Sequence, residues 1–147
     1  MQKSCFFIGH REAPAEIKQA LDETIELHIR DYGVLDYCVG NYGQYDRMAQ
    51  SALARAKQRY PDIRIHLLIP YHPSERTPHL PAGFDDTFFP PGMETVPRPV
   101  AIARANRYMA ENSDYIIAYV WHGASNARSV LEHAEKRGAH IENLATK

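Results

Sequence analysis

An uninterrupted apolar run near the start of the chain, Cys-Phe-Phe-Ile at residues 5–8, most constrains the fold. A short apolar run without alternation is typical of a strand that is buried on both faces of a sheet. Gly9, His10 and Arg11 follow directly, and Pro14 then leads into a helical pattern. In open α/β sheets the ligand crevice lies outside the carboxyl ends of the strands. We therefore expect His10 and Arg11 to be the first side chains at that edge.

Strand and helix patterns alternate along the rest of the chain. Four further apolar runs predict strands, at 34–39, 63–69, 115–121 and 139–144. Four stretches with helical spacing predict helices, at about 14–31, 45–60, 99–112 and 126–138. Strands that alternate with helices form a mostly parallel sheet covered on both faces. Right-handed crossovers then predict one Rossmann-like, three-layer α/β/α domain over residues 1–147, with a five-stranded sheet in the order 3-2-1-4-5.

Composition and charge narrow the classes of partner. The net charge is −1 at 147 residues, so the chain as a whole is not drawn to nucleic acid or to a membrane. No apolar run is long enough to span a membrane and the first residues lack a secretory layout, so we expect a cytoplasmic protein. Cys5 and Cys38 fall in predicted strands and are expected to be buried free thiols. The oligomeric state stays open, a homo-oligomer included.

The predicted topology places a switch point between the first and fourth strands, where the sheet order reverses. Three helix N-termini would converge there, each with unpaired N–H groups and the positive end of a helix dipole. Two arginines could add bidentate donors, so a ligand with a phosphate group fits this edge best. The candidate ligand-binding residues are Gly9, His10, Arg11, Gly40, Asn41, Gly43, Asp46, Asn106, Arg107, Gly123, Ser125 and Asn126.

Several of these residues also have a purely structural interpretation. Ser125 and Asn126 are residue types that cap helices, and Gly40 and Gly43 could simply permit a strand-to-helix turn. Asn106 shares the apolar face of its predicted helix, where its amide needs partners from backbone or ligand. Neither a Walker A sequence nor a dinucleotide fingerprint is present, and no histidine or cysteine spacing indicates a metal site. We expect neither a metal nor a cofactor.

The segment 70–99 departs from the alternating pattern, because it holds eight of the ten prolines. A long stretch without regular structure in a compact domain is usually functional or disordered, and its Phe and Met residues favour packing over disorder. We interpret it as a Pro-rich flap over the strand ends that acts as a lid, with a packed structural insertion as the alternative. Its charged candidates for ligand contact are Arg76, Asp85, Asp86 and, best placed, Glu94.

Four sequence features together resemble the SLOG superfamily. They are Gly9-His10-Arg11, the Gly40-x-x-Gly43-x-x-Asp46 turn, Asn106-Arg107-x-Met109 followed by Ser113-Asp114, and the glycine-polar turn after the fourth predicted strand. This Rossmann-like group is related to DNA processing protein A and to the "lonely guy" phosphoribohydrolases. The chain is most similar to small bacterial members without assigned function, which share the Pro-Pro-Gly-Met-Glu-Thr-Val-Pro run at 90–97. The resemblance implies a nucleotide or nucleotide-derived ligand; some members hydrolyse an N-glycosidic bond, and others bind single-stranded DNA or act as sensors.

Three functions follow as hypotheses. The first is binding of a nucleotide or ADP-ribose-like ligand through its phosphate at the strand carboxyl ends. The second is an N-glycosidase acting on a nucleoside monophosphate, with Asp46 or Glu94 at the ribose and Arg11 on the phosphate. Hydrolases of the superfamily carry a Pro-Gly-Gly-x-Gly-Thr-x-x-Glu turn whose glutamate serves the site. The double glycine and the glutamate are missing from the corresponding residues 121–129, so the resemblance favours binding over catalysis. The third is a DNA-binding module, against which the net charge weighs; nucleic acid is therefore expected to be an unlikely partner.

Overall fold

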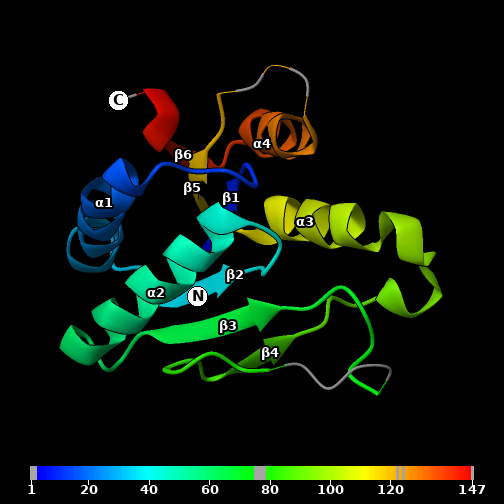
Figure 1. The fold of residues 1–147 in the computed structure, drawn as a ribbon, viewed down its shortest axis with the longest axis horizontal. Helices are drawn as coiled ribbons and strands as arrows, with labels where there is room; N and C mark the ends of the chain where they lie inside the picture. Colours follow the sequence, from blue (N-terminus) through cyan, green and yellow to red (C-terminus); the bar gives the residue numbers. More distant parts are fainter. Residues whose placement is uncertain (1–2, 75–78, 122, 124, 147) are drawn as a thin grey trace.

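The structure, a computed structural model, describes residues 3–74, 79–121, 123 and 125–146. Its centre is a six-stranded sheet in the order β4-β3-β2-β1-β5-β6, and every neighbouring pair of strands is parallel (Figure 1). The strands are β1 (Ser4–Gly9), β2 (Asp36–Val39), β3 (Arg64–Leu68), β4 (Asp86–Phe88), β5 (Tyr115–Tyr119) and β6 (His140–Asn143). The expected three-layer α/β architecture with a parallel sheet is confirmed.

The predicted number and order of strands are wrong. The five expected strands keep their relative places, but a sixth strand, β4, joins the sheet beyond β3. It comes from the Pro-rich segment 70–99, which was expected to lack regular structure. Residues 86–88 contain no proline, and an edge strand needs ladder bonds on one side only. His66 and Leu68 pair with Asp86 and Phe88, so β4 can form where a central strand could not.

The helices cover both faces of the sheet. Helices α1 (Lys18–Arg30) and α2 (Gln44–Arg59) pack together on one face, and α3 (Ala101–Asn112) and α4 (Asn126–Arg137) on the other (Figure 1). Short 3-10 turns lie at Ala15–Ile17 (η1), Met93–Thr95 (η2), Arg98–Val100 (η3) and Leu144–Thr146 (η4). In the described part of the chain, no helix has the length and apolar character needed to cross a bilayer.

Two apolar cores result from burying both faces of the strands. Alternate residues of β1 point to opposite faces, so Phe7 packs beneath α1 and α2 while Phe6 packs beneath α3 and α4. Cys5 and Cys38 are buried free thiols, as expected. Burial raises the pKa of the Cys38 thiol well above its ordinary value, which keeps it protonated.

Candidate functional site

The sheet order reverses at β1, which lies between β2 and β5. Gly9 pairs in register with Tyr119, and the His10 N–H donates to the Tyr119 carbonyl at 3.2 Å. The Trp121 N–H in turn donates to His10 Nε2 at 3.0 Å. The loop after β1 and the loop after β5 therefore lie side by side, as the predicted switch point required, and the His10 ring is engaged by the protein itself.

Two glycines near this point make room for helix α2. A Cβ atom at Gly9 would lie 2.4 Å from Cδ2 of the Tyr45 ring, and one at Gly43 would lie 2.7 Å from the Arg11 Cα. The Gln44 N–H donates to the Arg11 carbonyl at 2.6 Å. Both glycines thus permit close packing between the first turn of α2 and the end of β1, and that packing occupies the space beside them.

Asp46 holds the turn that follows β2. Its Oδ2 accepts the Tyr42 N–H at 3.0 Å, and a Cβ atom at Gly40 would lie 3.1 Å from the same oxygen. Burial raises the pKa of Asp46 to about 6, against the lowering effects of the Tyr42 N–H and of Arg47. The carboxyl group is therefore a structural acceptor for the 40–43 turn.

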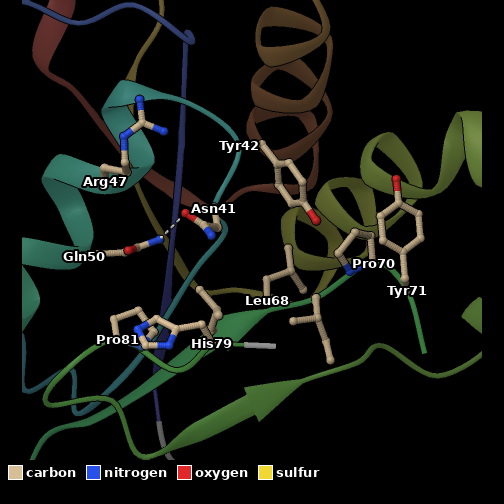
Figure 2. A pocket seen from close by; sticks show the side chains of 11 residues that line it. Asn41, Tyr42, Arg47, Gln50, Leu68, Pro70, Tyr71, His79 and Pro81 are labelled. Carbon is tan, nitrogen blue, oxygen red and sulfur yellow. Dashed lines mark hydrogen bonds between the residues drawn. The ribbon is translucent and has the colours of Figure 1, made fainter. Parts of the chain in front are cut away.

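A pocket of about 570 Å³ lies at the carboxyl ends of β2 and β3, one strand away from the switch point (Figure 2). Gln50 Nε2 donates to Asn41 Oδ1 at 3.2 Å and to the Gly40 carbonyl at 2.8 Å, which fixes both amides along one wall. The pocket is lined by Asn41, Tyr42, Arg47, Gln50, Leu67, Leu68, Ile69, Pro70, Tyr71, His79 and Pro81.

The 70–99 segment lines this pocket at two places. Pro70 and Tyr71 lie together at the right of Figure 2, and His79 and Pro81 lie together at its lower left. The Arg98 guanidinium lies 4.2 Å from the centre of the Tyr71 ring, a cation–π contact that holds the ring in place. Tyr42, with 36% of its surface exposed, lines the pocket from the β2 side.

The aromatic and basic residues of this pocket were not predicted from the sequence. Of the predicted ligand-binding residues, only Asn41 lines it. Tyr42 lies in the turn after β2 and Tyr71 lies just after β3, whereas Arg47 lies in the first turn of α2. Aromatic residues at two neighbouring strand ends were a usable signal, because carboxyl ends of adjacent parallel strands meet at one edge.

The other predicted residues are spread around the edge. Ser125 Oγ accepts the Arg128 N–H at 3.1 Å, which makes it the N-cap of α4, and Asn126 is the first residue of that helix. Nothing lies within 4 Å of a Cβ atom built at Gly123. Asn106 is half-buried on α3. Arg107 is exposed and pairs with Glu111 at 3.7 Å.

The two weak catalytic candidates lie at different places. Asp46 packs behind the 40–43 turn, whereas Glu94 is exposed and lines a separate pocket of about 150 Å³. Of the other charged flap candidates, Asp85 accepts from Lys57 Nζ at 2.9 Å and Asp86 contacts His66, so both have structural partners. Arg76 lies outside the described residues.

No family model and no curated protein matches the sequence. Solved structures match its fold, and two of them are of DNA processing protein A. DNA processing protein A from Streptococcus pneumoniae superposes with a TM-score of 0.66 at 15% identity, over 95% of this chain and 49% of that protein. The chain has the fold of this part of DNA processing protein A. The Helicobacter pylori protein, described for its single-stranded DNA binding mode, gives a TM-score of 0.59 at 17% identity, over 95% of this chain and 63% of that one.

DNA processing protein A belongs to the SLOG superfamily, so the expected resemblance is confirmed at the level of the fold. The chain spans about half of the S. pneumoniae protein and under two thirds of the H. pylori one. The expectation that nucleic acid is an unlikely partner is wrong, because a protein with this fold binds single-stranded DNA. That expectation relied on the net charge, which is a sum over the whole protein. A DNA strand contacts only one part of a protein surface, so the local charge there matters more than the net charge.

Proposed function

We propose that the chain binds single-stranded DNA at the carboxyl edge of its sheet, with one nucleotide seated in the pocket of Figure 2. The observation that carries this proposal is the combination of two tyrosines and an arginine on the wall of one pocket. Tyr42 and Tyr71 enter it from the ends of two neighbouring strands, and Arg47 enters it from α2. The single-stranded DNA binding of the H. pylori protein supports the choice of ligand.

The chemistry of the pocket matches what a single strand offers. Proteins that bind single strands stack bases on aromatic rings and place cations along the backbone. Tyr42 is exposed enough to receive a base, and Tyr71 is held in place by Arg98. Arg47 is exposed and can donate two parallel hydrogen bonds to a phosphate. The volume of about 570 Å³ lies in the range of small-ligand sites, roughly 300–1,000 Å³.

Fluorescence anisotropy with labelled oligothymidylate tests this proposal. Tyr42→Ala should weaken binding by roughly 5- to 150-fold, because base–aromatic stacking is worth ~1–3 kcal/mol. Tyr42→Phe keeps the ring and should bind nearly as tightly as the wild type. Arg30→Ala is a matched control, since Arg30 is an exposed cation in the last turn of α1, at the opposite edge of the sheet. Equal affinity for wild type and Tyr42→Ala would reject the pocket as the binding site.

A free nucleotide or ADP-ribose-like ligand in the same pocket is the second candidate. It is favoured by the walls that the 70–99 segment adds through His79 and Pro81, which shape a site for a compact ligand. The Asn41 and Gln50 amides could bind the edge of a base. Competition between a mononucleotide and labelled oligothymidylate separates the two functions. If the mononucleotide displaces the label only at a far higher concentration, single-stranded DNA is the favoured ligand. If the mononucleotide binds as tightly as the oligonucleotide, a free nucleotide is the favoured ligand.

A further inference from the structure

Two further pockets adjoin, one after the other, the pocket between Tyr42 and Tyr71. Pro70 and Tyr71 also line the neighbouring pocket of about 150 Å³, which extends over Glu94 and Arg98. Met93 lines both that pocket and a third one, of about 370 Å³, against α3. Each pocket shares lining residues with the next, so the three adjoin one another from β2, across turns η2 and η3, to α3, and together they are called the groove. In Figure 1 these turns lead from the end of β4 directly into α3.

The far part of this groove is basic. Arg98, Arg104 and Arg107 are all exposed along it, and Arg104 and Arg107 are neighbours on one face of α3. Two carboxylates, Glu94 and Glu111, also line it.

Glu111 is shared between Arg107, at 3.7 Å, and His133, at 2.9 Å. Within the described residues, Arg104 has no carboxylate partner. Its guanidinium is therefore the cation of this groove that is most available to a phosphate.

The switch point offers less room for the same purpose. His10 Nε2 already accepts the Trp121 N–H, and Ser125 Oγ already caps α4. The space beside Gly9 and Gly43 is filled by Tyr45 and by the Arg11 backbone. The predicted phosphate cradle is thus satisfied by contacts within the protein, whereas the groove toward α3 adjoins the pocket through two shared residues, Pro70 and Tyr71.

We propose that a bound strand leaves the pocket past Arg98 and places its phosphates along α3, at Arg104 and Arg107. The inference rests on the proposed function, because it assigns the route of the strand that the pocket holds. It names the ligand as an oligonucleotide longer than the single unit that the pocket can seat. Arg98, stacked on Tyr71, lies where the base site meets the phosphate track.

The test combines two ligand lengths with one double variant. Arg104→Ala with Arg107→Ala should weaken binding of a thymidylate dodecamer roughly 10-fold. The plot of log affinity against log salt concentration should become less steep, by roughly 0.7 for each phosphate contact that is lost. Binding of thymidine 5′-monophosphate should be unchanged, since a single nucleotide occupies the pocket alone. Replacing Arg104 and Arg107 together by lysine keeps both charges and should restore most of the affinity for the dodecamer.

The matched control is Arg30→Ala with Arg59→Ala. These two arginines lie at the far ends of α1 and α2, and each pairs with Glu26, at 3.7 and 3.4 Å, much as Arg107 pairs with Glu111. If the Arg104/Arg107 double variant binds the dodecamer with wild-type affinity and salt slope, the proposed route along α3 is overturned. The Tyr42→Ala variant tests the pocket independently of that result. A wild-type protein that binds neither ligand would overturn the proposed function, and the route with it.

Discussion

At the residue scale, His66 ties three strands together. Its Nε2 lies 2.5 Å from Asp36 Oδ1 on β2, and its Nδ1 lies 2.5 Å from Asp86 Oδ1 on β4. Both ring nitrogens can donate only in the charged imidazolium form. The hydrogen bond to Asp36 and then that to Asp86 raise the pKa of His66 to about 9, against the lowering effect of partial burial.

A pH dependence of stability follows from this pair of contacts. The folded-state pKa is raised above the ordinary value of 6.5, so the contribution is fully present below 6.5 and is lost as the pH rises through about 9. Thermal unfolding of the wild type should therefore show a fall in Tm over that window, and His66→Gln should show a flatter profile. Parallel profiles for the two proteins would contradict the role assigned to His66.

At the element scale, the contact between β1 and α2 depends on Gly9. The Tyr45 ring packs where a side chain at residue 9 would lie, and the Tyr45 hydroxyl donates to the Ile117 carbonyl on β5 at 2.9 Å. The ring is fully buried and held at its far end. It cannot move away without breaking that hydrogen bond, so the helix and strand must separate if Gly9 is enlarged.

Gly9→Ala should lower the free energy of unfolding by about 1–3 kcal/mol, the usual cost of overpacking a filled core. Urea denaturation measures this change. Gly123→Ala is the matched control, because an added Cβ there meets nothing within 4 Å, and its unfolding midpoint should stay close to that of the wild type. Equal midpoints for the two variants would show that the Tyr45 ring yields more easily than its contacts indicate.

The elements that could be predicted from the sequence are those with a local apolar pattern of their own. Residues 5–8 and 115–119 are apolar runs buried on both faces, so local pattern alone identified their strands. β4 has exposed and half-buried residues only, and it exists because residues 66–68 offer a free edge to pair with. Pairing across the sheet leaves no local pattern, and the strand was therefore missed.

At the scale of the whole molecule, the site could be predicted only in part. The carboxyl edge followed from topology, as did the approach of residues 9–11 to the end of β5, which was expected at 123–126 and is observed at 119–121. The pocket itself arises because Tyr42 and Tyr71 come from strands that are adjacent in space but far apart in the chain, with His79 added by the 70–99 segment. Such convergence depends on side-chain placement, which periodicity and glycine spacing do not encode.

Hydrogen exchange of the protein with and without an oligothymidylate dodecamer tests the central claim most directly, because it locates the strand on the fold. Protection should appear at 40–47, at 69–72 and along 98–107, the segments that contain the pocket residues and the arginines. The exposed ends of α1 and α2, at Arg30 and Arg59, should exchange equally fast in both samples. Protection confined to Arg11 and Ser125, with 40–47 and 69–72 unchanged, would contradict the account.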